Sequence, residues 1–304
     1  MSAFLLQESS SQSSYLYGRF WPFSAIRLIW SRMAAADSKR TKSLNATLKP
    51  LSEAVLRRLT NDAVTTFLGE AERYEAATRP GLQLALSNEP VADMNMLIVG
   101  AGADDDHFRS MVSSCLDRKT PFLVMIYPEA GKTLDDIAAD LGLVYAADFP
   151  IMVRDDLPLQ PSGNPDVDVV CAHNAEDADA SADVMVSAYS MPKDSVLRAL
   201  PASLFDIPGA DVYVARLNGE AAGSVTLTYH GDTCGIWAMG TVAARQRGGI
   251  GRRLLSNAMV QARDNGIRRF FLGATPAGFR LYEGLGFNTV CSTRVWVSGE
   301  THQA

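Results

Sequence analysis

The sequence has few cysteines, and they lack the close spacing that metal and redox motifs require. Its four cysteines, Cys115, Cys171, Cys234 and Cys291, lie far apart, and no C-x-x-C motif occurs. Only Cys171 has a close histidine, His173, and one such pair does not make a zinc site. We therefore expect reduced, mostly buried thiols, no disulfide framework and no bound metal.

A long apolar run and an excess of one charge are also missing. No apolar stretch reaches about 18 residues, which predicts the absence of a membrane-spanning helix. The 28 basic and 34 acidic residues are mixed along the chain, with a net charge of −6, so no nucleic-acid partner is expected. The 304 residues are enough for two domains that each bury a core. These features favour a cytoplasmic enzyme and leave a homodimer open.

Residues 1–46 differ from the rest, being rich in serine and arginine and poor in acidic residues. Two interpretations remain open. One is a disordered leader, with Met1 or Met33 as the initiator. The other is a transit peptide or surface-binding helix, which would direct the chain to an organelle through residues 1–35.

A glycine- and arginine-rich stretch at residues 245–253 predicts an anion site. An alternating apolar run at residues 235–243 precedes it and predicts a strand, and an apolar stripe after it predicts a helix. Glycines at such a junction let backbone N–H groups approach a ligand closely. The first N–H groups of a helix lack internal partners and favour an anion, and the arginines add donors suited to phosphate.

The spacing within this stretch excludes two common phosphate motifs. A dinucleotide fingerprint would need glycine or alanine at Leu254, and a P-loop would need a lysine. The remaining pattern, Gln246-x-x-Gly249-x-Gly251, resembles the Q/R-x-x-G-x-G/A loop of the GNAT superfamily of N-acetyltransferases. Residues 281–287, Leu-Tyr-Glu-Gly-Leu-Gly-Phe, are similar to a second motif of that family, so the resemblance covers about residues 167–298.

The resemblance implies a fold, a cofactor and a reaction. It implies an α/β (α+β) GNAT fold, with a central mixed, mostly antiparallel sheet flanked by helices. It further implies acetyl-CoA as the donor and a primary amine of a small molecule or peptide as the acceptor. Tyr282 would be the general acid, since the pKa of a phenol is close to that of a thiol leaving group. The residues implied to hold the coenzyme are Gly240, Thr241, Val242, Gln246, Arg247, Gly248, Gly249, Ile250, Gly251 and Arg252.

The general base is not evident. Many members of this family carry a carboxylate on the strand before the loop, and this strand has none. His230, in the preceding turn, is one candidate, because histidine titrates near neutrality. A water chain, or an amine that is already neutral, would need no residue. The missing carboxylate also leaves open a second function, a sensor or partner subunit that binds acetyl-CoA without turnover.

The domain at residues 167–304 is expected to begin with a strand, Val167 to Ala172, after a linker at residues 158–166. A helix from about residue 175 to Tyr189 and a short helix near residues 196–204 follow. Strands are expected at residues 211–217 and 221–229, joined by Asn218-Gly219, then at 233–242, 268–272 and 288–297. The resemblance implies that the helical region lines the acceptor site, with Tyr189, Met191 and Phe205 as candidates.

Residues 47–157 are predicted to form a first domain. Two apolar stripes indicate helices near residues 51–59 and 64–71, and strands are expected at 81–86, 94–99 and 121–127. A helix is expected over residues 104–119, and another is expected to open at Thr133, capped by that side chain. Gly131-Lys132-Thr133 does not form a P-loop, because Ile126 stands where its first glycine should be.

This first domain resembles a degenerate copy of the second. Residues 137–143 align with residues 281–287, and the stripe Phe108, Met111, Val112, Cys115 matches Leu255, Ala258, Met259, Ala262. Chance similarity of two α/β patterns is the alternative. At the helix start the copy has aspartates at residues 104–106, which would repel pyrophosphate, and Ala138 replaces Tyr282. We therefore expect coenzyme binding in the second domain only.

Overall fold

A computed structural model describes residues 50–155 and 157–298. The leader expected at residues 1–46 lies outside this range. In the described part, a single mixed sheet of eleven strands has the order β1-β2-β3-β4-β11-β5-β10-β9-β8-β7-β6. Two of its neighbouring pairs are parallel and the others antiparallel, as the expected fold class requires. No helix within the described range is long and apolar enough to cross a membrane.

The first half begins with a helix and adds three strands before its next helix. Its elements are α2 (Glu53–Leu68), β1 (Glu75–Arg79), β2 (Leu82–Leu86), η1 (Ala92–Met94), β3 (Asn95–Val99), α3 (Asp105–Asp117), β4 (Leu123–Ile126), η2 (Pro128–Ala130), α4 (Thr133–Asp140) and β5 (Leu143–Arg154). The apolar stripe expected in α3 is buried at all four positions. It packs in one core with β2, β3 and β4.

The second half repeats this order, with an additional first strand, β6, and with two α-helices in place of the single α2. Its elements are β6 (Val167–Cys171), α5 (Ala175–Tyr189), α6 (Lys193–Ala199), η3 (Ala202–Phe205), β7 (Ala210–Leu217), β8 (Glu220–His230), β9 (Thr233–Thr241), η4 (Ala243–Arg245), α7 (Ile250–Asp264), β10 (Arg269–Gly273), α8 (Pro276–Glu283) and β11 (Asn288–Ser298). The sequence β8-β9-α7-β10-α8-β11 thus follows β2-β3-α3-β4-α4-β5 element by element. The internal similarity is therefore structural.

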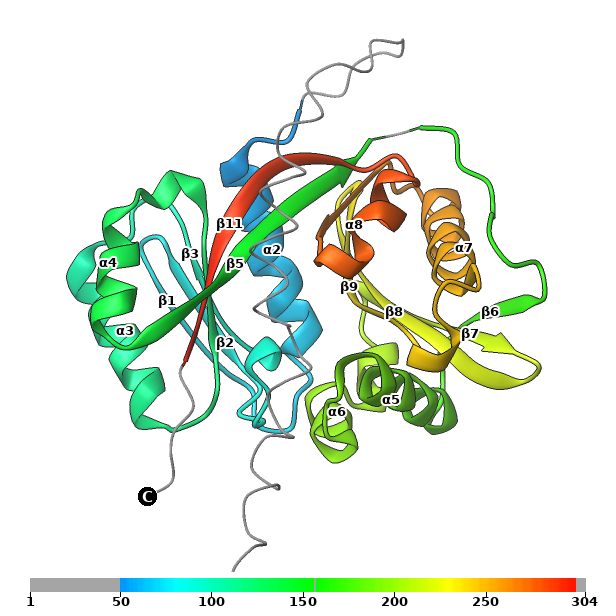
Figure 1. The fold of residues 1–304 in the computed structure, drawn as a ribbon, viewed down its shortest axis with the longest axis horizontal. Helices are drawn as coiled ribbons and strands as arrows, with labels where there is room; N and C mark the ends of the chain where they lie inside the picture. The colour runs from blue at the N-terminus through cyan, green and yellow to red at the C-terminus, as the bar shows by residue number, and fades with distance from the viewer. Residues whose placement is uncertain (1–49, 156, 299–304) are drawn as a thin grey trace, which may run out of the picture. The chain divides into compact units, whose positions relative to one another are not determined.

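The two halves exchange their last strands. β11 of the second half pairs with β4 of the first, and β5 of the first half pairs with β10 of the second. β11 and β5 also pair with each other along almost their whole length, from Asn288↔Val153 to Ser298↔Leu143. In Figure 1 they run side by side as the long red and green strands between the two halves. Each half therefore depends on the other to complete its sheet.

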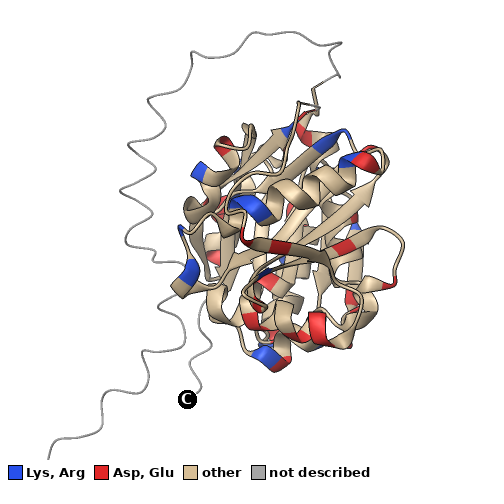
Figure 2. Cartoon of the chain, turned by 90° about the vertical axis from the view of Figure 1, so that its right-hand side faces the viewer, with Lys and Arg blue, Asp and Glu red and all other residues tan. Residues whose placement is uncertain are grey.

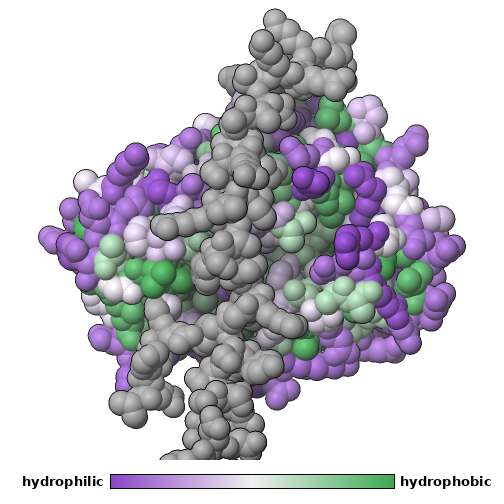
Figure 3. Space-filling view, viewed as in Figure 1, coloured by the Kyte–Doolittle hydropathy of each residue, from purple (hydrophilic) through white to green (hydrophobic). Residues whose placement is uncertain are grey.

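Helices cover the sheet through apolar faces. The stripe of α7, Leu254, Leu255, Ala258, Met259 and Ala262, is fully buried and packs with residues of β8, β9 and β10. Hydrophilic side chains predominate around the visible face, with smaller hydrophobic areas between them (Figure 3). Lysine and arginine are interspersed with acidic residues on the side shown in Figure 2, in agreement with the mixed charge of the sequence.

Some predicted details differ from the structure. The two predicted helices near residues 51–59 and 64–71 are one helix, α2, which ends at Leu68 and whose buried face includes Leu56 and Phe67. β1 was not predicted, because its residues EAATR are almost all exposed and show no alternation. The prediction that Thr133 caps its own helix is wrong: Lys132 occupies the cap position, and no side chain of the described residues caps the first turn of α4.

Candidate functional site

The strands β9 and β10 separate after a short parallel pairing. Only Thr233, Cys234 and Gly235 of β9 pair with β10, although β9 continues to Thr241. Residues 236–241 therefore have no β10 neighbour along that edge. The helices α7 and α8 approach this opening: a Cβ on Gly251 would lie 3.3 Å from the Met239 Cε, and Tyr282 contacts the same methionine.

Met239 lies at this opening between two tyrosines. The Tyr282 hydroxyl, from α8, donates to the Met239 sulfur at 3.7 Å. The Tyr189 hydroxyl, from the last residue of α5, donates to the Met239 carbonyl oxygen. From the sequence, Tyr282 was predicted as the general acid and Tyr189 as a residue of the acceptor site. In the structure, both side chains contact Met239. The two phenol hydroxyls therefore both lie at the edge of β9 that β10 leaves open.

Tyr282 is buried, with 7% of its surface exposed, and its ring packs edge-on against Phe287 at 6.0 Å. Burial raises the pKa of Tyr282 to about 12. The pKa of Tyr282 is therefore farther from that of a thiol than the pKa of an ordinary phenol would be. Because the side chain stays protonated near neutral pH, it can act as a proton donor and not as a base.

The glycine stretch lies at the start of α7, as the sequence predicts. Gly249 precedes the helix with φ 77°, a left-handed conformation that glycine adopts without strain. No side chain of the described residues caps the first turn of α7, so its first N–H groups have no side-chain partner there. The linker supports this turn, since Asn164 N–H donates to the Gly249 carbonyl at 3.4 Å.

The arginines of this stretch differ in their contacts. Arg245 forms an ion pair with Glu220, and Arg252 donates to the Gly284 carbonyl at 3.0 Å. The Arg253 Nε lies 3.4 Å from the Val167 carbonyl. Arg247 is exposed with φ 64° and has no hydrogen bond or ion pair to any residue in the described ranges. Arg247 is thus the arginine most available to an anion.

The remaining residues predicted to hold the coenzyme surround the same turn. The Gln246 amide donates to the Thr241 carbonyl at 3.5 Å, and Gly248 is exposed. The Ile250 side chain is buried in the core, so only its backbone can face a ligand. The Val242 N–H already donates to the Ala222 carbonyl at 3.0 Å, so it is not free to bind the coenzyme. A Cβ on Gly240 would lie 2.9 Å from the Ala188 Cβ, so this glycine lets α5 approach β9.

A β-bulge next to Met239 was not predicted. Ser224 pairs with Gly240 and Thr226 with Trp237, so Val225 of β8 faces both Ala238 and Met239. Ala238 has φ 46°, which is uncommon for a residue with a side chain. A bulge disrupts the ladder and reorients backbone groups. No glycine or turn residue marks this position in the sequence, so no local signal reveals it.

His230 lies away from this cluster. His230, at the end of β8, pairs with Thr233, the first residue of β9. Thr233 is six residues before Met239, which is about 20 Å along a strand. The His230 side chain is 54% exposed and lies 3.4 Å from the Asp62 carboxylate of α2. The structure therefore does not bring His230 together with Tyr282.

The equivalent positions in the first half are closed. Each residue from Met96 to Val99 of β3 pairs with β4, and Tyr127 N–H continues the pairing to the Val99 carbonyl at 2.8 Å. The first turn of α3 is capped by Asp104, whose carboxylate accepts from His107 N–H at 2.9 Å. Ala138, the counterpart of Tyr282, is fully buried.

The two other acceptor-site candidates, Met191 and Phe205, and most of the cysteines lie in or against the apolar core. Met191 is buried, and Phe205 packs against the apolar core between α5 and β7. Cys115, Cys234 and Cys291 are buried and Cys171 is exposed, all as free thiols. Within residues 50–155 and 157–298, no cluster of three or more histidine, cysteine, aspartate or glutamate side chains could hold a metal ion.

Known proteins share both the domain and the fold. Residues 182–287 match the family model described as Acetyltransferase (GNAT) family. A GCN5-related N-acetyltransferase from Kribbella flavida aligns with 81% of this chain and 96% of its own, at 17% identity and a TM-score of 0.61. No curated protein matches the sequence.

Two further solved structures share the fold. A functionally unknown conserved protein from Staphylococcus epidermidis aligns over 74% of this chain and 94% of its own, at 15% identity and a TM-score of 0.57. A GCN5-related N-acetyltransferase from Sphaerobacter thermophilus aligns over 72% of this chain and 80% of its own, at 14% identity and a TM-score of 0.50.

Proposed function

Since the chain carries an acetyltransferase domain of the GNAT family at residues 182–287, we propose that it transfers an acetyl group from acetyl-CoA to a primary amine. The acceptor would belong to a small molecule or a peptide. The observation that carries the proposal is the opening between β9 and β10, with the uncapped start of α7 at one end and Tyr282 beside it.

The start of α7 suits the pyrophosphate of the donor. Its free N–H groups lie at the positive end of the helix and favour an anion. Arg247, which is exposed and forms no ion pair with any described residue, adds a guanidinium suited to phosphate oxygens. The arm of the coenzyme would extend along residues 239–242 toward Tyr282, which would donate its proton to the departing thiolate.

The second half would therefore bind the coenzyme, whereas the first half would not. In the first half the strands β3 and β4 stay paired, and the capped helix start carries aspartates that would repel a pyrophosphate. We accordingly propose residues 167–304 as the catalytic domain and residues 47–157 as a degenerate copy that completes the sheet.

Calorimetry with acetyl-CoA, followed by thiol release in the presence of amines, tests the proposal. We expect a 1:1 binding isotherm for the wild-type chain and amine-dependent release of thiol. Binding without release of thiol would favour the second candidate, a sensor or partner subunit. The absence of a carboxylate from strand β9 supports that candidate. No heat with acetyl-CoA would refute both candidates.

A further inference from the structure

The opening between β9 and β10 has two faces, and the proposed donor would lie on only one of them. A Cβ on Gly251, at the start of α7, would approach Met239, and so does Tyr282 of α8. The donor would therefore lie on the face that α7 and α8 cover. A Cβ on Gly240 would instead lie 2.9 Å from Ala188 of α5, on the opposite face. An acceptor that meets the thioester would enter from this second face.

Trp237 lies on the second face, at one side of the opening. Trp237 and Gly240 pair with residues that are two positions apart on β8, so both point to the same face. The Trp237 ring stacks on Phe67 of α2 with the ring centroids 6.1 Å apart, and its Nε1–H donates to Thr228 at 2.9 Å. Trp237 is nevertheless partly exposed. The ring is therefore held in one orientation while part of its surface stays accessible.

Phe149 of the first half lies at the other side of the opening. The last pair between the two strands joins Gly235 of β9 to Phe271 of β10. Trp237 and Gly273 each follow that pair by two residues, so their positions lie opposite each other across the gap, on the same face of the sheet. A Cβ on Gly273 would overlap the Phe149 ring. This ring therefore occupies the space that a side chain at Gly273 would fill.

Phe271 lies at the closed end of the opening, in the last pair before the strands separate. Its ring meets the Trp237 ring edge-on, with centroids 6.1 Å apart and planes at 85°. Phe271 is buried, whereas Trp237 and Phe149 are partly exposed. We call these three side chains the aromatic site. One of its three rings comes from the first half.

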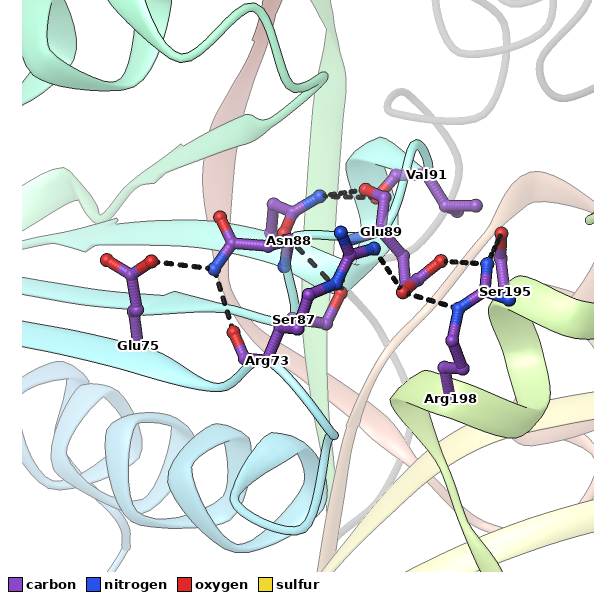
Figure 4. Close-up of polar contacts among 9 residues, drawn as sticks. Arg73, Glu75, Ser87, Asn88, Glu89, Val91, Ser195 and Arg198 are labelled. Carbon is purple, nitrogen blue, oxygen red and sulfur yellow. Dashed lines mark hydrogen bonds and ion pairs between the residues drawn. The ribbon is translucent and has the colours of Figure 1, made fainter.

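A polar contact also holds the first half beside this face. The Glu89 carboxylate, 1% exposed, accepts from Arg198 Nε at 2.9 Å and Nη2 at 2.7 Å, and from Arg73 at 2.7 Å. Arg198 belongs to α6, which packs on α5. Figure 4 shows Glu89 between the two arginines, joining a loop of the first half to the second half. Together with the pairing of β5 and β10, this contact fixes Phe149 at the opening.

We propose that the aromatic site binds the ring of the acceptor, so that the chain acetylates a primary amine joined to an aromatic ring by a short alkyl chain. This inference rests on the proposed acetyl transfer and specifies its acceptor. Aromatic rings gain from edge-on and offset contacts with one another beyond the burial of apolar area. Trp237 precedes Met239 by two residues, about 7 Å along a strand, which suits a short alkyl chain between ring and nitrogen. None of the three side chains is a carboxylate that would pair with a second ammonium group, which disfavours a polyamine.

The aromatic ring of the acceptor takes no part in the transfer. The nitrogen of the neutral amine forms a bond to the acetyl carbon, and the C–S bond breaks. The thiolate takes the proton of Tyr282, and one N–H proton of the nitrogen restores the phenol. The products are one amide and one thiol. Loss of a contact in the aromatic site should therefore raise the KM for the acceptor and leave kcat nearly unchanged.

Phe149→Leu tests the aromatic site, with 2-phenylethylamine, n-butylamine and spermidine as acceptors. In the wild type we expect kcat/KM to be at least about tenfold higher for 2-phenylethylamine than for the other two amines. Phe149→Leu should raise the KM for 2-phenylethylamine about fivefold, as loss of an aromatic pair does, and change that for n-butylamine less than about twofold. The control is Tyr145→Leu, an aromatic residue of the same strand that is 43% exposed and lies four residues away. It should keep the wild-type preference.

Gly273→Ala disturbs the same site without changing an aromatic residue. Its new methyl group would displace the Phe149 ring, so the preference for 2-phenylethylamine should fall as it does in Phe149→Leu. Because each preference compares two amines on one variant, a partly unfolded preparation does not alter it. With the chain saturated by a non-transferable thioether analogue of acetyl-CoA, both variants should bind 2-phenylethylamine about fivefold more weakly in calorimetry. Their affinity for acetyl-CoA should be unchanged.

Equal kcat/KM for the three amines in the wild type would overturn the inference, as would an unchanged preference in either variant. A wild-type chain that binds acetyl-CoA but acetylates none of the three amines would also overturn it. Failure of the wild type to bind acetyl-CoA would instead refute the proposed function.

Discussion

The ion pairs of Glu89 predict a measurable loss of stability in Glu89→Gln. Burial alone would raise the pKa of this carboxyl, but hydrogen bonds from Arg198, Arg73 and Ser195 outweigh it and lower the pKa from 4.5 to about 2. Such a shift corresponds to about 3 kcal/mol at ~1.4 kcal/mol per unit. Because the side chains of Arg73 and Arg198 are 58% and 37% exposed, screening reduces our expectation to about 2 kcal/mol.

The sign of the pH dependence follows from the lowered pKa. Glu89 stabilises the folded chain fully above the unfolded pKa of 4.5, and this contribution is lost as the pH falls toward about 2. At pH 3, roughly 40% of it should remain. The gap between wild type and Glu89→Gln should therefore be largest at pH 7 and less than half as large at pH 3.

Urea denaturation followed by circular dichroism at both pH values measures this gap. Glu283→Gln is a matched control, since Glu283 is exposed on α8 and forms no ion pair with the described residues. We expect this control to lie within about 0.5 kcal/mol of wild type. An equal loss for Glu89→Gln at pH 7 and pH 3, or no loss at pH 7, would show that the ion pairs do not stabilise the contact between the halves.

Three other experiments address the site and the sheet. Tyr282→Phe should lower kcat about 100-fold or more while the Kd for acetyl-CoA stays within about threefold; equal losses in both would argue against proton donation. Gly249→Asp should abolish acetyl-CoA binding in calorimetry through its φ of 77° and its charge, whereas Gly142→Asp, at φ 82° with open space around it, should not; unchanged affinity in Gly249→Asp would refute the loop assignment. Residues 158–298 produced alone should show no cooperative urea transition, since β10 and β11 lose their partners β5 and β4; a cooperative fragment would contradict this.

Local patterns predicted the elements of this fold well. The buried faces of α3 and α7 follow from apolar residues at helical spacing. The hairpin between β7 and β8 was predicted from its turn residues, Asn218 and Gly219, which both have positive φ. The glycine stretch and Tyr282 were identified from short motifs, and both lie at the opening between β9 and β10. Their roles remain predictions.

Long-range features could not be predicted in the same way. No local pattern reveals that β11 pairs with β4 and β5, because strand pairing depends on residues more than 130 positions away. The bulge at Ala238 arises from register with β8, and the contact between the halves at Glu89 depends on Arg198, 109 positions away. These positions carry no composition or spacing signal of their own.

The exchanged strands affect how the chain can fold during synthesis. On a ribosome, the first half emerges with β4 and β5 present but without β11, which lies between them in the finished sheet. A nascent chain must therefore keep a gap at the centre of its sheet until residues 288–298 leave the exit tunnel. Such late, non-local closure slows folding and exposes unpaired edges, so this protein should depend on chaperones more than a chain of similar length built from two independent domains.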